Sequence, residues 1–278
     1  MTKIAIDAGH GLYTAGKRCM KSLDPKETRE WVLNSRIAEK LDDLLDDYEC
    51  EVLRTDDMDG SSDISLAARC KAANDWKADV FISIHHNAGA NGRSAGGTVI
   101  YYYSSLAARK QQCQELYNAI VAETKLVGNR SEKVIHYPYY VIKNTDMPAF
   151  LIENGFMDSS VDVPIILTEA HTNKTAQGIL NFLVKEYNLK KKVVSKPADK
   201  TQNNVQKKYY RCQCGVFSVK GNAETLKAKL NKAGFAAIIN LVDNKYYVQV
   251  GAYGSKQNAL NMATKVKSKG FDAFVTYR

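Results

Sequence analysis

The sequence predicts an α/β fold, in which a twisted mixed sheet of about six strands is flanked by helices, followed by a small α+β domain of βαββαβ order. Two observations support this prediction. Short apolar runs alternate with helix-like segments over the first two thirds of the chain, and the last third repeats one strand, helix and strand pattern. With 278 residues, the chain is long enough for one sizeable core and a second, smaller one.

Six short apolar runs are predicted to form the large sheet. They are rich in β-branched and aromatic residues, as strands usually are, and helix-like stretches separate them. The runs span residues 4–6, 49–54, 79–84, 97–103, 139–143 and 150–154.

Two amphipathic helices are predicted beside this sheet. Apolar residues recur at helical spacing from Leu33 to Leu45, with Asp and Lys residues on the opposite face, and Glu30 begins this helix on its buried side. The segment 174–187 repeats the pattern and closes the large domain.

The predicted organisation is a large domain over residues 1–189, a linker over 190–208 and a small domain over 209–278. The linker segment is polar, contains one Pro and lacks any periodicity. Residues 190–278 contain 18 Lys and Arg against 4 Asp and Glu, whereas residues 1–189 contain 21 against 26. The basic residues are concentrated in the tail, which indicates an anionic partner such as nucleic acid, a membrane surface or a wall polymer.

The small domain consists of two sequence copies offset by 36 residues. Residues 212–217 (CQCGVF) align with 248–253 (VQVGAY), and the Gly-Phe pair at 234–235 aligns with that at 270–271. One strand, helix and strand unit of this size cannot bury its own sheet face. We therefore expect the two copies to share one core, with both helices on the same face.

The N-terminus and the cysteines indicate where the protein is made. The chain begins with a strand-like pattern instead of a secretory signal, and no apolar run approaches the roughly 20 residues of a membrane span. We therefore expect synthesis in the cytoplasm and no membrane insertion. Six cysteines at unrelated spacings favour reduced thiols over a disulfide framework.

Three segments place metal-binding residue types just past a strand or at the start of a helix. His10 follows the first strand, Glu30 begins the first helix, and His85 and His86 end the third strand. Ligands of open α/β sheets bind at such strand ends, and two imidazoles with one carboxylate suffice for a catalytic Zn²⁺. Taken singly, each residue also fits a structural role, such as a loop histidine or a glutamate that complements the helix dipole.

A further carboxylate, Glu153, lies at the end of the last apolar run. A carboxylate in such a place is costly unless it is paired or used. We interpret Glu153 as the general base, which takes a proton from a zinc-activated water and returns it to the departing amine.

Together and in this order, these segments resemble the zinc-dependent N-acetylmuramoyl-L-alanine amidases of the type 3 family, over residues 1–187. That family begins with a strand and a GHG turn, which corresponds to the turn at His10. Its second motif, a Glu followed four residues later by Asn on a helix, corresponds to Glu30 and Asn34. The resemblance implies that His10 and Glu30 are zinc ligands.

The third and fourth motifs of the family complete the implied site. The motif S-I-H-x-N-A corresponds to residues 83–88, which makes His85 rather than His86 the third zinc ligand and places Asn87 at the substrate. The motif M-P-x-x-L-x-E-x-G-F gives Glu153 the catalytic role. The implied reaction is hydrolysis of the amide between N-acetylmuramic acid and L-alanine in peptidoglycan.

A Tyr-rich stretch at His136 and Tyr139 fits the wall of a substrate groove as well as it fits edge packing. These two residues are therefore not part of the predicted catalytic set.

The tail resembles the SPOR family of peptidoglycan-binding domains, which carry a strand of the type found at residues 246–253. Family members recognise glycan strands that have lost their stem peptides. Gln213, Phe217, Gln249 and Tyr253 occupy equivalent positions of the two copies, and we expect them to present a glycan-binding face on the sheet. Packing of Phe217 and Tyr253 on the core is the alternative.

Other functions use the same features. A zinc peptidase that acts within the stem peptide would need the same zinc ligands. The basic tail with its βαββαβ order is reminiscent of RNA-binding modules, but it lacks their aromatic strand signature. We therefore expect peptidoglycan rather than nucleic acid as the partner. A phage endolysin that reaches the wall after release is the favoured setting, with a host autolysin or sporulation hydrolase as the alternative. The sequence makes no prediction of the oligomeric state.

Overall fold

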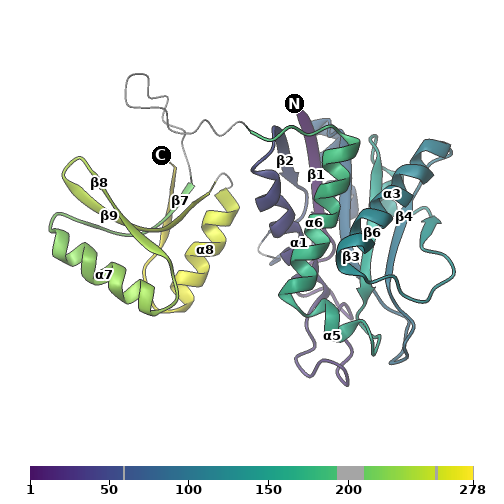
Figure 1. Ribbon diagram of the computed structural model, residues 1–278, viewed down its shortest axis with the longest axis horizontal. Helices are drawn as coiled ribbons and strands as arrows, with labels where there is room; N and C mark the ends of the chain where they lie inside the picture. Colours follow the sequence, from purple (N-terminus) through teal and green to yellow (C-terminus); the bar gives the residue numbers. More distant parts are fainter. Residues whose placement is uncertain (59, 193–209, 254–255, 278) are drawn as a thin grey trace. The chain divides into compact units, whose positions relative to one another are not determined.

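The computed structural model describes residues 1–58, 60–192, 210–253 and 256–277 (Figure 1). The chain divides into two compact units, Met1–Val193 and Val194–Arg278. Each unit has its own hydrophobic core.

The chain still belongs to the first unit at residues 190–192. The carbonyl of Lys190 accepts a hydrogen bond from the N–H of Glu49 at 2.8 Å, and the N–H of Lys192 donates to the carbonyl of Asp47 at 2.8 Å. The remaining residues of the segment predicted as a linker, 193–208, lie outside the described residues.

Within the described residues, the first unit is a six-stranded mixed sheet with the order β2-β1-β3-β6-β4-β5. All neighbouring strands are parallel except β4 and β6, so the predicted α/β class and mixed sheet are confirmed. The strands are β1 (Thr2–Ala8), β2 (Cys50–Arg54), β3 (Val80–Asn87), β4 (Thr98–Tyr102), β5 (Val134–His136) and β6 (Ala149–Phe156). The helices are α1 (Glu30–Leu45), α2 (Leu66–Trp76), α3 (Ala107–Thr124), α4 (Tyr140–Lys143), α5 (Val163–Ile166) and α6 (Glu169–Glu186).

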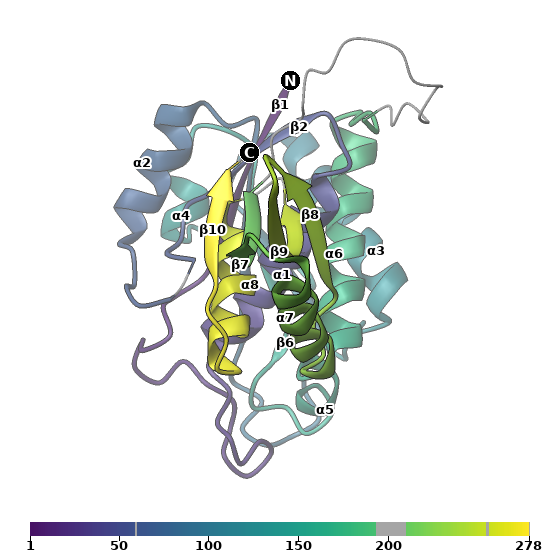
Figure 2. The ribbon, with the colours of Figure 1, turned by 90° about the vertical axis from the view of Figure 1, so that its left-hand side faces the viewer.

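Helices cover both faces of this sheet. Figure 2 shows α2 and α4 on one side of the unit and α3 and α6 on the other. Because alternate residues of a strand point to opposite faces, β3 sends Ile82 and Ile84 into the core with α1, α3 and α6, and Phe81 into the core with α2 and α4. The face on which a strand residue lies therefore decides which helices it meets.

Both predicted helices are confirmed. Helix α1 begins at Glu30 and buries Ile37, Leu41 and Leu45, and α6 buries Ile179 and its apolar neighbours against the same core. None of the helices in the described residues combines the length and the apolarity that a membrane crossing requires.

The prediction of a strand over residues 139–143 is wrong. Residues Tyr140–Lys143 form the single turn of α4, and the sixth strand is β5 (Val134–His136) at the edge beside β4. A short apolar run is compatible with either a strand or a helix. Here the adjacent residues Val141 and Ile142 both enter the core beneath α2, whereas neighbouring residues of a strand would face opposite sides.

The second unit confirms the predicted βαββαβ order. Its sheet has the order β10-β7-β9-β8 with all neighbours antiparallel, and Figure 1 shows α7 and α8 on the same face. Both helices contribute to a single core with the strands, so the two sequence copies do share one core. The elements are β7 (Tyr210–Phe217), α7 (Lys220–Lys232), β8 (Ala237–Val242), β9 (Lys245–Tyr253), α8 (Lys256–Ser268) and β10 (Phe274–Tyr277).

Gly178 of α6 sets how closely α6 packs on α3. A Cβ at this position would lie 2.5 Å from the Cα of Ile120 in α3. We predict that Gly178→Ala lowers the free energy of unfolding of the first unit by about 1–3 kcal/mol, because overpacking outweighs the gain in helix propensity. Urea unfolding followed by circular dichroism measures this change.

Gly221→Ala in α7 is the matched control, because a Cβ there meets nothing within 4 Å. It should be neutral or slightly stabilising. Equal behaviour of the two variants would contradict the packing argument.

Candidate active site

His10 lies just past the carboxyl end of β1, in a left-handed backbone conformation with φ 67°. The preceding residue, Gly9, donates its N–H to the carbonyl of Ile84 at 2.9 Å, so this turn runs directly beside β3. A Cβ on Gly9 would overlap the imidazole of His85. Glycine is required here because the turn that carries one imidazole passes against the other.

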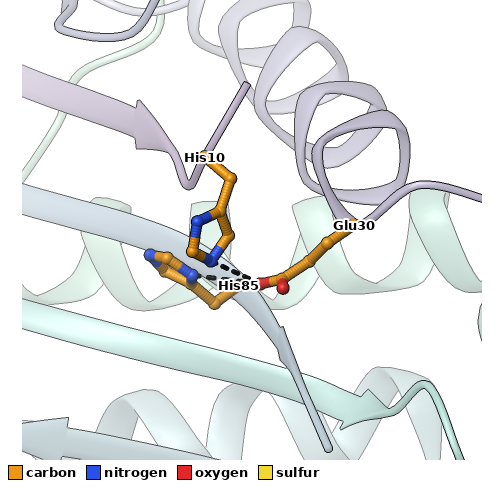
Figure 3. A group of neighbouring side chains, drawn as sticks. All are labelled: His10, Glu30 and His85. Atoms are coloured by element: carbon orange, nitrogen blue, oxygen red, sulfur yellow. Dashed lines mark hydrogen bonds and ion pairs between the residues drawn. The ribbon is translucent and has the colours of Figure 1, made fainter. Parts of the chain in front are cut away.

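Glu30 is the first residue of α1, and its side chain is only 1% exposed. Its Oε1 lies 3.4 Å from Nε2 of His10 and 3.1 Å from Nδ1 of His85 (Figure 3). One helix start and the ends of two adjacent parallel strands thus bring together the three residues that the sequence predicts as metal ligands.

The three side chains form a group that fits a metal ion. One ligand atom from each of His10, Glu30 and His85 lies within 4.8 Å of the others. The second oxygen of Glu30, Oε2, is buried and has no hydrogen-bond partner. Two imidazole nitrogens and a carboxylate oxygen are a donor set that Zn²⁺ accepts in hydrolases.

The electrostatics of Glu30 and His85 favour their charged forms. Burial would raise the pKa of Glu30, but hydrogen bonds and positive charge from His10 and His85 hold this pKa well below its usual range. Burial would lower the pKa of His85, but its hydrogen bond to Glu30 raises it.

His86 points to the other face of β3. Its Nδ1 lies 2.8 Å from Oδ1 of Asn34 in α1, and burial lowers the pKa of its imidazole to about 3. The hydrogen bond from His86 to Glu30 comes from its backbone N–H, which donates to Oε1 of Glu30 at 3.2 Å. The structure thus brings His85, and not the side chain of His86, to the other two predicted ligands.

Two asparagines hold the backbone of the segments that carry the imidazoles. Nδ2 of Asn34 donates to the carbonyl of Gly9 at 3.1 Å, and Nδ2 of Asn154 donates to the carbonyl of His85 at 3.1 Å. The carbonyl of Asn154 in turn lies 3.1 Å from Nε2 of the buried His171 in α6. The sequence singled out Asn34 through its motif but assigned no role to His171.

Glu153 lies on β6 directly beside His85 of β3 and is 8% exposed. Its Oε2 is buried without a hydrogen-bond partner. Burial, with a smaller contribution from the negative charge of Glu30, raises the pKa of Glu153 to about 7, although His85 and Lys17 oppose the rise. Glu153 can therefore both accept and release a proton near neutral pH.

A buried ion pair between Asp7 and Arg69, which the sequence analysis missed, supports the His10 turn from below. Nη1 of Arg69 donates to Oδ1 of Asp7 and to the carbonyl of Ala8, both at 2.7 Å, and Nη2 donates to the carbonyl of His10 at 3.0 Å. Asp7, like Glu153, is a carboxylate on a buried strand. A carboxylate within an apolar run is the sequence signal that could have drawn attention to Asp7.

A pocket of about 520 Å³ opens over these residues. Its wall includes His10, His85, Glu153 and also Asn87, the residue that the sequence places at the substrate. Tyr139 of the Tyr-rich stretch lines the pocket and also packs on the core, so it fits both interpretations given for it. Other side chains of the wall that the sequence did not single out are Lys17, Leu66, Tyr140, Val141, Leu151 and Met157.

The expectation that four tail residues share one face is wrong. Gln213 and Gln249 pair across β7 and β9 and are nearly fully buried, whereas Phe217 and Tyr253 pack on the core that lies under the helices. The β7–β9 register shifts before Gly215, and Gly251 of β9 has a positive φ, so the alternation of faces is broken in both strands. A glycan-binding role of the four residues stays a prediction.

An α/β sheet that gathers two histidines and two carboxylates near its carboxyl edge, beneath an open pocket, fits a hydrolase, and three of these residues could hold a metal ion. The model of the N-acetylmuramoyl-L-alanine amidase family matches residues 4–185, and that of the SPOR domain matches residues 206–277. The chain belongs to the N-acetylmuramoyl-L-alanine amidase family.

Characterised relatives share both the length and the sequence of this chain. The sporulation-specific N-acetylmuramoyl-L-alanine amidase of Bacillus subtilis is 35% identical over 87% of this chain and 86% of its own. The N-acetylmuramoyl-L-alanine amidase CwlM of Bacillus licheniformis is 31% identical over 86% and 85%. The endolysin of Bacillus phage SPP1 is 33% identical over 69% of each chain.

Solved structures show the same catalytic fold. The catalytic domain of CwlV from Paenibacillus polymyxa superposes with a TM-score of 0.61 at 28% identity, over 68% of this chain and all of that domain. An N-acetylmuramoyl-L-alanine amidase from Clostridium difficile gives 0.60 at 29% identity, over 67% and 97%.

We predict that Arg69→Lys weakens metal binding. Lysine keeps the charge opposite Asp7 but cannot reach the carbonyls of Ala8 and His10 at the same time, so the His10 turn loses its support. Residues that hold metal ligands in place typically contribute about 10–100-fold to metal affinity. Competition with a fluorescent zinc chelator measures this change.

Arg54→Lys is the matched control, because Arg54 forms a similar buried pair with Asp56. This variant should lose stability while its zinc affinity stays unchanged. A drop in zinc affinity of the same size in both variants would refute the positioning role of Arg69.

Proposed function

We propose that the first unit uses one Zn²⁺ ion to hydrolyse the amide bond between N-acetylmuramic acid and the L-alanine of the stem peptide. Family membership supports the substrate. The observation that carries the zinc proposal is the group formed by His10, Glu30 and His85, in which the buried Oε2 of Glu30 has no hydrogen-bond partner. These three residues would hold the ion through two nitrogens and one oxygen.

When bound, zinc polarises a carbonyl and makes water acidic enough to lose a proton near neutral pH. Glu153 accepts this proton on a carboxylate oxygen while the water oxygen bonds to the amide carbon. The same carboxyl group then donates the proton to the amide nitrogen as the C–N bond breaks. The products are the lactyl carboxylate of the sugar and a stem peptide with a free L-alanine amine.

The second unit is proposed to hold the enzyme on peptidoglycan at the bacterial cell wall. The SPOR match and the basic tail support this role. An endolysin that reaches the wall after synthesis in the cytoplasm is the proposed setting, which the similarity to the SPP1 endolysin supports.

Loss of Glu153 or of the metal is expected to abolish the reaction. We predict that Glu153→Gln lowers kcat by about 10²–10⁴-fold without loss of zinc, since the amide cannot take the proton. Removal of zinc with a chelator should stop the wild type, and added Zn²⁺ should restore it. Mass spectrometry of digested peptidoglycan identifies the new chain ends.

Glu30→Gln is the companion variant, because it should lose zinc affinity as well as activity. Peptides released by the wild type must begin with a free L-alanine amine. Cleavage within the stem peptide would instead assign a zinc peptidase, and activity after chelation would rule out the metal mechanism.

The tail is expected to affect retention on the wall rather than the reaction. We predict that a chain ending at residue 192 cleaves a soluble muramoyl peptide at the full-length rate but sediments less with intact sacculi. Full-length protein should stay bound to sacculi at 0.5 M salt, where binding to nucleic acid is about 10³-fold or more weaker than at low salt. Retention by DNA or RNA instead of sacculi would favour a nucleic-acid-binding tail.

A further inference from the structure

Lys17 brings a positive charge to the wall of the active-site pocket. Among the described residues that line the pocket, it is the only Lys or Arg. Its side chain is 45% exposed, and Nζ lies 3.8 Å from Oε2 of Glu30. The ammonium group is thus close to the reacting centre and accessible from the pocket.

The backbone holds Lys17 in this position. Its carbonyl accepts a hydrogen bond from the N–H of Glu30 at 3.0 Å, and the next residue, Arg18, forms a β-bridge with Arg29. Further along the loop, the N–H of Met20 donates to the carbonyl of Met157 at 2.9 Å. The loop is therefore attached both to the start of α1, which carries Glu30, and to the end of β6, which carries Glu153.

The ion pair between Lys17 and Glu30 is a long one. Oε1 of Glu30 already faces both imidazoles and the N–H of His86, and 3.8 Å is longer than a hydrogen bond. The neighbouring Arg18 pairs with Glu27 at 3.2 Å and does not line the pocket. Lys17 can therefore form a closer contact with an anion that enters the pocket.

A cation at this place suits an anionic substrate. Glu153 lines the same pocket, and its ionised form would repel a negatively charged peptide. In a stem peptide, the residue after L-alanine is a D-glutamate whose α-carboxyl group is either free or converted to a carboxamide. This group lies within about 7 Å of the scissile bond, the length of two extended residues.

We propose that Lys17 binds the free carboxylate on the second residue of the stem peptide and makes the enzyme prefer the carboxylate form over the carboxamide form. This inference rests on the amidase function proposed above. A charge-assisted hydrogen bond forms with the carboxylate, whereas the carboxamide presents a neutral oxygen and gains less from the ammonium group.

Two synthetic muramoyl peptides that differ only in this carboxylate or carboxamide test the proposal. Wild type should show a lower KM for the carboxylate form. Lys17→Met should raise the KM for that form about 5–20-fold with little change in kcat, and leave the KM for the carboxamide form within about 2-fold. Lys17→Arg should keep the preference. Lys21→Met, in the same loop but outside the pocket, is the matched control and should behave as wild type.

The remaining outcomes overturn the proposal. A fall in kcat on both substrates would make Lys17 a group that stabilises the transition state, and a fall in zinc affinity would make it a support for Glu30. Equal KM values of the wild type for both substrates would show that the carboxylate is not recognised. If the wild type cleaves neither substrate, the proposed amidase function itself is wrong. The reaction of the wild type alone therefore distinguishes that failure from a failure of the Lys17 proposal.

Discussion

The candidate active site depends on three adjacent parallel strands, β1, β3 and β6, that end at the same edge of the sheet. Their registers place Asp7 beside Ser83 and His85 beside Glu153, so residues of one face lie at the same height. Side-chain alternation then turns these polar groups towards α2 and α4, while their neighbours along each strand enter the other core. A shift of one strand by a single residue would exchange the faces and separate the ligands.

The ion pair of Asp7 and Arg69 is better explained by the geometry that it imposes than by stability. Taking two charges out of water costs several kcal/mol, which their mutual attraction often does not exceed. The other contacts of Arg69 reach the carbonyls of Ala8 and His10, which are the backbone of the ligand-bearing turn. Asp7 also accepts hydrogen bonds from Thr55 and Ser83, so the pair ties β1 to β3 and to the residue that follows β2.

The elements whose structure depends on neighbouring residues could be predicted from the sequence. The helix at Glu30 and the strand that carries Glu153 follow from apolar spacing, and the candidate ligands follow from the order of the family's motifs. The strand predicted at 139–143 failed because a short apolar run does not specify its period, and only packing beneath α2 decides it. The prediction that Phe217 and Tyr253 share a face with the two glutamines was wrong, because a register shift interrupts the alternation of faces on which it depended. Arg69 was missed because its partner Asp7 is 62 positions away.

The two carboxylates of the site, Glu30 and Glu153, show how position sets chemical role. Glu30 faces two imidazoles that stabilise its charge, so it stays ionised and suits a metal ligand. Glu153 stands on the adjacent strand with an unpaired oxygen, and burial beside another carboxylate raises its pKa, so it suits proton transfer. In hydrolases, environments that give two carboxyl groups different pKa values commonly also give them different chemical roles.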